Sequence, residues 1–323
     1  MAHVHQVEVK RQLGPADIAA VSALLEASSQ HDGHPAFGEH QWLDLVHGGR
    51  SRLAEGASGF AGIMAFAGVS GRAPDGARPI AYAQVSHDGQ SWAIEYTVDP
   101  AWRPSPEMAA DLVGAALGVV GAEGGGRVHL WRSHPDTESD AVAAAVGLRA
   151  GRDLLQLRRP LPTGEPWSIA VRPFVPGRDE EEWLEVNNRA FGWHPEQGGW
   201  DLATLKGREE LGWFDPGGFL LHEENGRLAG FCWTKVHDDP PVPLGEIYVI
   251  AVDPDFGGRG LGRELTLAGL DHLAGKGLTV GMLYVDATNT GARALYDKLG
   301  FTLDHIDRAY VGDVPGGQWP GAQ

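Results

Sequence analysis

Hydrophobic positions along the first half of the chain alternate between a period of two and a period near 3.6, which predicts interleaved strands and helices. A helix is expected from Asp17, because Ile18, Val21, Leu24 and Leu25 recur at helical spacing after it. The strands near 59–69 and 79–86 are expected to form a hairpin. The other expected elements of this half are a strand at 6–10, a strand at 92–98, a helix at 106–120, a strand at 128–131 and a helix at 140–146.

The second half repeats this alternation. Two strands are expected to form a hairpin about the turn Glu224-Asn225-Gly226, because Asn-Gly favours the tight turns of hairpins. An apolar run from Glu246 then predicts a strand that ends at Asp253-Pro254. The other expected elements are a helix at 180–191, strands at 218–222 and 227–235, a helix at 263–273 and a helix from Asn289 that ends at Gly300.

The similar order of elements reflects an internal repeat. Val98-Asp99-Pro100 matches Val252-Asp253-Pro254 at an offset of 253 − 99 = 154 residues. Gly147-Leu148 matches Gly300-Phe301 at an offset of 300 − 147 = 153 residues. The proline-rich segment 160–166 lies between the copies, so we predict two domains at 1–160 and 167–323.

A glycine-rich turn follows the strand that begins at Glu246. Gly258, Gly260 and Gly262 would free backbone N–H groups at the start of a helix, where the helix dipole favours an anion such as phosphate. The spacing is not that of a dinucleotide fingerprint, whose third glycine would fall on Arg263, and the Lys-Ser/Thr pair of a P-loop is absent. The turn alone therefore fits a phosphate site or a purely structural bend.

This turn and the segment Asn289 to Phe301 together resemble the GNAT family of acyl-CoA-dependent N-acetyltransferases. The family's Gln/Arg-x-x-Gly-x-Gly/Ala turn is matched at Gly260 and Gly262, while Gly257 stands where Gln or Arg is usual. The resemblance implies an α/β chain of two tandem GNAT folds, each a mostly antiparallel mixed sheet flanked by helices, with acetyl-CoA as co-substrate. The cofactor-binding residues it implies are Ile250, Ala251, Val252, Gly257, Gly258, Arg259, Gly260, Leu261, Gly262, Arg263, Asn289, Thr290, Gly291, Ala292, Arg293 and Ala294.

Acetyl transfer from a thioester to an amine needs a base for the ammonium and an acid for the leaving thiolate. Glu246 begins the strand before the turn and is the candidate base, unless it is a strand-end carboxylate in water. Tyr296 is the candidate acid, unless it only packs its helix. The first copy lacks both groups, with Trp92 opposite Glu246 and Ala143 opposite Tyr296. It also has no glycines at 102–108, opposite the turn, and therefore reads as a catalytically empty scaffold.

A narrower resemblance covers nearly the whole chain. The segments 187–191, 194–200, 231–237 and 245–249 look like those of the actinobacterial mycothiol synthase family. That family uses acetyl-CoA to acetylate the cysteinyl amine of cysteinyl-glucosaminyl-inositol, a thiol pseudodisaccharide. The resemblance implies that the substrate contacts are Glu39, Glu196, Lys235, Glu246 and Tyr284.

Composition bears on the ligand class, the location and the metal content of the protein. A net charge of −17 argues against nucleic acid, which requires a basic face. No apolar run approaches the length of a membrane span, and residues 1–5 do not begin a secretory signal, so we expect a cytoplasmic protein. One cysteine and two loop histidines, His31 and His34, do not make a metal site, and we expect none. A fused pair of copies is expected to act as a monomer.

Two other functions fit the same residues. The chain could acetylate a different amine, such as an aminoglycoside or a protein N-terminus. It could also be an acyl-CoA-binding module without catalytic activity, in which case Glu246 would be dispensable.

Overall fold

The computed structural model describes residues 5–46, 59–68, 77–87, 91–103, 106–192, 198–238 and 242–317. The chain divides into two compact units. The first contains Met1–Asp153 together with Ile306–Gln323, and the second contains Leu154–His305. The end of the chain thus groups with the first unit, because residues Asp307 to Pro315 pair with a strand of that unit. The domain ranges 1–160 and 167–323 stay a prediction.

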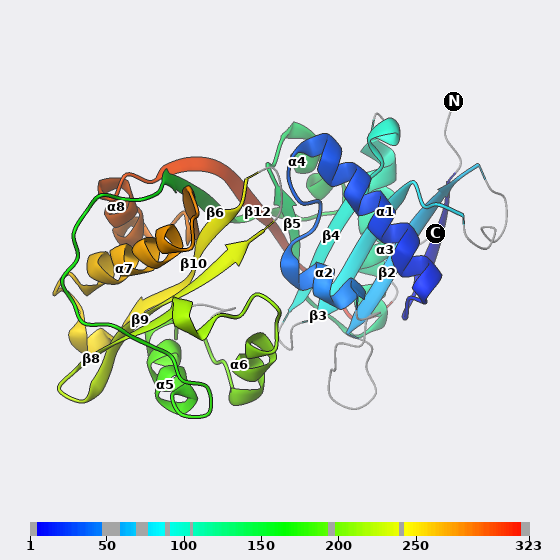
Figure 1. Cartoon of the computed structure of the whole chain (residues 1–323). Coiled ribbons are helices and arrows are strands. Elements are labelled where there is room, and N and C mark those ends of the chain that lie inside the picture. Colours follow the sequence, from blue (N-terminus) through cyan, green and yellow to red (C-terminus); the bar gives the residue numbers. More distant parts are fainter. Residues whose placement is uncertain are drawn as a thin grey trace. The chain divides into compact units, whose positions relative to one another are not determined.

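The first unit is a mixed sheet with helices on both faces (Figure 1). Its strand order is β1-β2-β3-β4-β5-β12, and every described pairing within the unit is antiparallel except β4 with β5. Helices α3 and α4 share one core with the sheet, and α1 and α2 share another. The elements are β1 (His5–Lys10), α1 (Pro15–Asp32), α2 (Glu39–Val46), β2 (Phe60–Ala67), β3 (Ala81–His87), β4 (Trp92–Val98), α3 (Pro106–Ala122), β5 (Gly125–Ser133), α4 (Thr137–Ala145) and β12 (Thr302–Pro315).

The second unit has the same plan, with strand order β6-β11-β10-β9-β8-β7 and one parallel pair, β10 with β11. Helices α7 and α8 lie on one face of this sheet, and α5 and α6 lie on the other (Figure 1). The elements are β6 (Arg149–Pro160), β7 (Arg172–Pro173), α5 (Glu180–Ala190), α6 (Leu202–Glu209), β8 (Phe219–Glu224), β9 (Arg227–His237), β10 (Leu244–Val252), α7 (Leu261–Gly275), β11 (Val280–Asp286) and α8 (Thr290–Lys298).

Alternate residues of β9 build the two faces of the second unit. Cys232 faces α7, where a Cβ on Gly269 would lie 2.4 Å from its sulfur, so helix and strand approach closely because that residue is glycine. Trp233 faces the other way and meets Trp183 of α5 edge to face at 5.9 Å. Each tryptophan is fully buried, which contributes about 1.5–3 kcal/mol per side chain. This aromatic layer packs against β9 and β10 on the face opposite α7.

The parallel strands β10 and β11 separate after a short contact. They pair only from Gly245 to Ile247, opposite Gly281 to Leu283. Beyond that point β10 continues against β9 through Val252, and β11 continues against β6. One edge of the end of β10 is therefore left open toward β11. In the first unit β4 and β5 separate in the same way after three pairs, as expected for two copies of one fold.

The two copies differ at a bulge. The pairing of β10 with β9 shifts register between Ile247 and Val249, whereas β4 pairs with β3 without interruption. The bulge adds one residue to β10 that β4 does not have. The offset of 154 residues between the copies, counted at Asp253, is therefore one too large for residues that precede the bulge. Matching the parallel pairs places Ala93, and not Trp92, opposite Glu246, so that part of the sequence alignment was wrong. Neither residue is acidic, and the first copy still lacks the carboxylate.

Candidate active site

The predicted phosphate turn lies between β10 and α7 and is built on Asp253. This side chain is 1% exposed and accepts the N–H of Asp255 at 2.9 Å, and its other oxygen pairs with Arg189 of α5. Gly258 and Gly260 follow with φ values of +76° and +81°, a conformation that favours glycine. No atom lies within 4 Å of where their Cβ atoms would be. The backbone of the turn is therefore open to a ligand.

The turn offers a row of N–H groups. Among the described residues, none accepts a hydrogen bond from the N–H of any residue from Gly258 to Gly262. The last two of these belong to the first turn of α7, whose dipole places partial positive charge there. The turn arginines, Arg259 and Arg263, meet the partly exposed carboxylates of Glu224 at 3.0 Å and Glu165 at 2.9 Å. Such pairs are weak in water and could be exchanged for phosphate.

A pocket of about 120 Å³ lies beside this turn, at the open edge of β10. Three predicted cofactor residues of β10 line it, together with one glycine of α7 and the candidate acid of α8. Its lining residues are Ile250, Ala251, Val252, Gly262, Thr266, Leu295 and Tyr296. A Cβ on Gly262 would lie 3.5 Å from Leu295, so the missing side chain leaves room between α7 and α8. The structure thus brings the predicted strand edge, the turn and Tyr296 together.

Tyr296 is 7% exposed and packs edge to face on Phe301 at 5.7 Å. Burial, and secondarily the nearby Cys232, raises the pKa of the phenol well above its usual value. No described residue accepts or donates a hydrogen bond at its hydroxyl. The phenol therefore stays protonated and has a proton to donate within the pocket.

The segment 289–294 forms the cap and first turns of α8. Asn289 caps the helix by accepting the N–H of Ala292 at 3.1 Å, and Arg293 donates to the carbonyl of Ala287 at 2.7 Å. These bonds fix the end of α8 that follows β11. They are what the sequence pattern of an Asn cap predicts.

Glu246 lies on the opposite face of the sheet from α7. It is 6% exposed, and Oε2 of its carboxylate lies 2.7 Å from Nε2 of His237. Lys235 is its cross-strand partner on β9, and its ammonium sits 4.7 Å from the ring centre of Trp213 and 5.6 Å from that of Tyr248. Sequence reasoning did not select His237, although its spacing of two from Lys235 on a strand puts both on one face.

The other predicted substrate contacts lie in different places. Tyr284 shares the face of Glu246, because it follows Met282, the parallel partner of Glu246, by two residues. It is 38% exposed, and its hydroxyl accepts from the amide of Gln156 at 2.7 Å. Glu39 is the first residue of α2 in the first unit. Glu196 lies outside the described residues.

Comparison with known proteins decides the family. Residues 181–301 match the family model "Acetyltransferase (GNAT) family". The mycothiol acetyltransferase of Acidimicrobium ferrooxidans is 40% identical, over 92% of this chain and 94% of the relative. That of Thermomonospora curvata is 42% identical, over 92% and 94%. The chain belongs to the mycothiol acetyltransferase family.

Solved structures share the fold. A GCN5-related N-acetyltransferase from Sphaerobacter thermophilus superposes with a TM-score of 0.65 at 23% identity, covering 98% of each chain. A tandem GNAT protein from the clavulanic acid biosynthesis pathway gives 0.66 at 17% identity, covering 97% of this chain and 100% of that one. The predicted pair of GNAT folds is confirmed, and the protein is an N-acetyltransferase.

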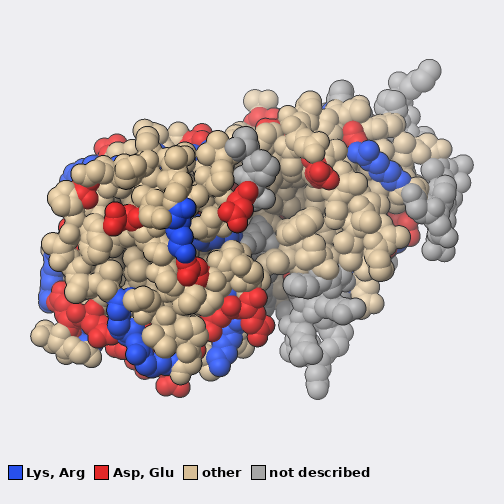
Figure 2. Space-filling view, in the orientation of Figure 1, with Lys and Arg blue, Asp and Glu red and all other residues tan. Residues whose placement is uncertain are grey.

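Three further features concern metal binding, membrane spans and surface charge. In the described part of the chain, no group of three or more His, Cys, Asp and Glu side chains is placed to hold a metal. Over the described segments, no helix is long and apolar enough to span a membrane. Lys and Arg side chains lie scattered among Asp and Glu side chains on the face shown in Figure 2.

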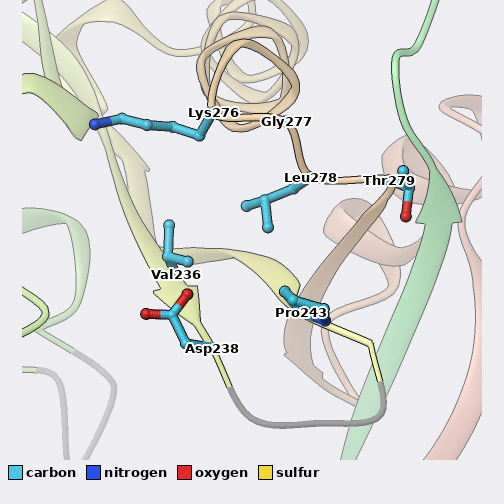
Figure 3. Close-up of a pocket in the computed structure, with 7 residues that line it drawn as sticks. All are labelled: Val236, Asp238, Pro243, Lys276, Gly277, Leu278 and Thr279. Carbon is cyan, nitrogen blue, oxygen red and sulfur yellow. The ribbon is translucent and has the colours of Figure 1, made fainter.

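A larger cleft of about 410 Å³ lies elsewhere in the second unit (Figure 3). It is bounded by the ends of β9 and α7 and the start of β10, where Val236, Leu278 and Pro243 face one another. Its lining residues are Val236, Asp238, Pro243, Lys276, Gly277, Leu278 and Thr279. None is a predicted site residue, and Val236 alternates with Lys235 and His237 to the other face of β9. Size alone therefore does not identify the active site of this acetyltransferase.

Proposed function

We propose that the protein transfers the acetyl group of acetyl-CoA to the cysteinyl amine of cysteinyl-glucosaminyl-inositol, the last step of mycothiol biosynthesis. The observation that carries the proposal is the opening between β10 and β11. It joins the phosphate turn to the pocket of Tyr296, and Glu246 lies on the last stretch of β10 before the strands part. The relatives from Acidimicrobium ferrooxidans and Thermomonospora curvata are named mycothiol acetyltransferase.

The turn and the open strand edge account for binding of acetyl-CoA. The pyrophosphate would accept from the free N–H groups of Gly258 to Gly262, with Arg259 and Arg263 nearby. The pantetheine arm would run along the unpaired edge of Ile250 to Val252, whose backbone groups are available to its amides and to the thioester carbonyl. The segment 289–294 at the start of α8 would close the other side.

The chemistry then needs a base and an acid. Glu246 would take a proton from the substrate ammonium, directly or through water, and the amine would form the C–N bond as the C–S bond breaks. Tyr296 would protonate the departing thiolate, and the second proton of the amine would restore the phenol. The products are an amide and the CoA thiol, and Glu246 releases to water the proton that it took. The place of Tyr296 in the lining of the pocket supports its role as the acid, and its phenol is protonated before the transfer, as that role requires.

Substrate selection is proposed to rest on polar side chains around Glu246. Lys235 and Tyr284 share its face of the sheet and could bond a polyhydroxylated sugar and inositol. Glu39 and Glu196 are proposed as further contacts from the family resemblance. The N-terminal copy is proposed to be a scaffold without catalysis, since Ala93 and Ala143 stand where Glu246 and Tyr296 do. The enzyme is proposed to be cytoplasmic and monomeric. Size-exclusion chromatography with light scattering would test whether it is a monomer.

The test is a product assay with competing amines. The purified protein, acetyl-CoA and the cysteinyl pseudodisaccharide should give the N-acetyl product, detected by mass spectrometry, with stoichiometric release of CoA. An aminoglycoside and a peptide with a free N-terminus should be much poorer substrates in kcat/KM. Equal or better turnover of either alternative amine would contradict the proposed substrate, and no product from any amine would contradict the proposed reaction.

A further inference from the structure

We infer that His237 is a positioning residue for Glu246, holding the carboxylate of the base by one oxygen so that the other is presented to the substrate amine. The inference deepens the proposed function and rests on its assignment of Glu246 as the base. It starts from the 2.7 Å contact between Nε2 of His237 and Oε2 of Glu246.

The proposed role of Glu246 decides which group donates. A base must be ionised before it takes a proton, and an ionised carboxylate only accepts hydrogen bonds, so the tautomer assigned to His237 carries its proton on Nε2. The contact uses one oxygen of Glu246, and the described residues supply no bond to the other. One oxygen is thus engaged in a charge-assisted bond and the other remains for the amine proton.

Burial makes this contact necessary. Glu246 is 6% exposed, so its carboxylate has little access to water, and leaving its oxygens without a protein hydrogen bond would cost free energy. The neighbouring Lys235 lies cross-strand, but its ammonium is held over the rings of Trp213 and Tyr248. The side chain of His237 is 26% exposed, so its far nitrogen can reach water while Nε2 faces the carboxylate.

The strand pairing sets the geometry. Glu246 is opposite Lys235, and His237 is opposite Leu244, so His237 is the diagonal neighbour of Glu246 on the same face. Glu246 precedes the bulge after Ile247 and lies where β10 pairs with both β9 and β11, and His237 pairs with Leu244 at the end of β9. The base and its partner are therefore held by regular strand pairing before the bulge.

A pair of substitutions separates positioning from packing. H237L removes the donor, while H237Q places an amide N–H near the position of Nε2. Loss of a charge-assisted bond predicts that H237L lowers kcat roughly 10- to 100-fold with little change in KM for acetyl-CoA. H237Q should recover most of that loss. H272L is the matched control, because His272 of α7 also faces a carboxylate, that of Asp215 at 3.7 Å, but belongs to neither pocket.

Two further measurements exclude a merely structural role. In H237L the acid limb of the profile of kcat/KM against pH should move to higher pH, since the ionised carboxylate has lost its donor. The described elements bring several charged groups to this face: Lys235 on β9, Arg208 on α6, which bonds the hydroxyl of Tyr248, and Arg158 on β6, the cross-strand partner of Met282, with its ion-pair partner Asp304. All are unchanged in the variants. In a double-mutant cycle, H237L should have no further effect on kcat once E246Q is present.

The outcomes distinguish the two proposals. If E246Q keeps wild-type kcat, the base assignment in the proposed function fails. If E246Q loses activity while folded H237L matches wild type in kcat and in pH profile, only the role of His237 is overturned. Equal losses from H237L in the wild-type and E246Q backgrounds would also overturn it. Should H237L not fold, H237Q and H237N replace it, and a wild-type pH profile and kcat in H237N, whose shorter amide does not reach Oε2, would overturn the inference.

Discussion

Arg189 of α5 forms an ion pair with Asp253, the buried residue that ends β10 and begins the phosphate turn. The two residues are 64 positions apart in the chain. Asp253 uses its other oxygen to accept the N–H of Asp255, so one side chain ties the helix on one face of the sheet to the turn at its end. The start of the proposed acetyl-CoA site thus depends on a helix that does not line the pocket.

The first prediction concerns this pair. Arg189→Leu leaves the carboxylate of Asp253, which is 1% exposed, without its cation. We expect a loss of about 1–3 kcal/mol in the free energy of unfolding, less than for a fully buried pair because Arg189 is itself 47% exposed. Urea denaturation measures the loss, and KM for acetyl-CoA should rise. Lys276→Gln, which breaks the exposed pair with Asp215, is the control and should cost under about 1 kcal/mol. Equal stability of the two variants would contradict the prediction.

The second prediction concerns the width of the pocket. Gly262→Leu adds a side chain between α7 and α8, where a Cβ lies 3.5 Å from Leu295 and the rest must enter the pocket. KM for acetyl-CoA should rise by on the order of tenfold or more, equivalent to ~1.4 kcal/mol, with no loss of stability because glycine is a poor helix former. Gly275→Leu at the other end of α7 is the matched control, since open space surrounds that position. Unchanged KM in Gly262→Leu would remove the pocket from the proposed path of the cofactor.

Much of this site could be predicted because its signals are local. Positions of positive φ in the turn are occupied by glycine, which the sequence shows directly. The N-cap of α8 is likewise visible in the sequence as Asn289. The Asn225-Gly226 turn likewise gives the β8–β9 hairpin, with both residues at positive φ. Such features depend on a few neighbouring residues, and a single sequence is enough to find them.

The features that escaped prediction depend on distant residues. The contact of His237 with Glu246 needs the register of β9 on β10, and the bulge after Ile247, which changed the partner of Glu246 in the first copy to Ala93, leaves no mark in residue type. Helix α6 was not predicted, although Asp201 caps it by accepting the N–H of Thr204. The pairing of β12 with β5 joins residues more than 150 positions apart, beyond any local pattern.

The third prediction separates two tyrosines. Tyr296→Phe removes a hydroxyl that has no partner among the described residues, so stability should hardly change. Loss of the acid should lower kcat roughly 100-fold. Tyr310→Phe in the first unit should do the opposite, costing about 1 kcal/mol of stability because its hydroxyl donates to Asp140 at 2.7 Å, with kcat unchanged. Steady-state kinetics and thermal unfolding of both variants make the comparison.

The raised pKa of Tyr296 also predicts how kcat/KM depends on pH. Because burial raises its pKa above the ordinary 10, the phenol remains a proton donor through neutral and moderately alkaline solution. Any basic limb of kcat/KM below pH 10 should therefore belong to another group, such as the substrate amine or thiol. Tyr296→Phe should keep that limb in place while lowering the whole profile. A limb that disappears in the variant would contradict the assignment.

The last prediction concerns Glu95 of β4, whose carboxylate accepts the N–H of Gly38, the residue before α2, at 2.7 Å. Burial raises the pKa of this carboxyl from 4.5 to about 7, against the opposing effects of that N–H and of Arg132, with a small further rise from Asp307. Between pH 4.5 and 7 the folded protein therefore keeps a proton that the unfolded chain has released. Stability contributed by this group is present below pH 4.5 and is lost as pH rises through 7.

Glu95→Gln keeps an oxygen that can accept from Gly38 and removes the ionisation. The variant should be more stable than wild type at pH 8, by about 1–2 kcal/mol once the partial exposure of the side chain is allowed for, and the difference should vanish near pH 5. Asp179→Asn is the control of opposite sign. Although burial opposes it, hydrogen bonds from Arg178, Arg172 and the N–H of Val175 hold the pKa of Asp179 at about 2, so this substitution should destabilise at pH 8. Urea denaturation at the two pH values measures both effects, and a Glu95→Gln variant that is no more stable at pH 8 than at pH 5, relative to wild type, would show that Glu95 ionises in the folded protein without cost.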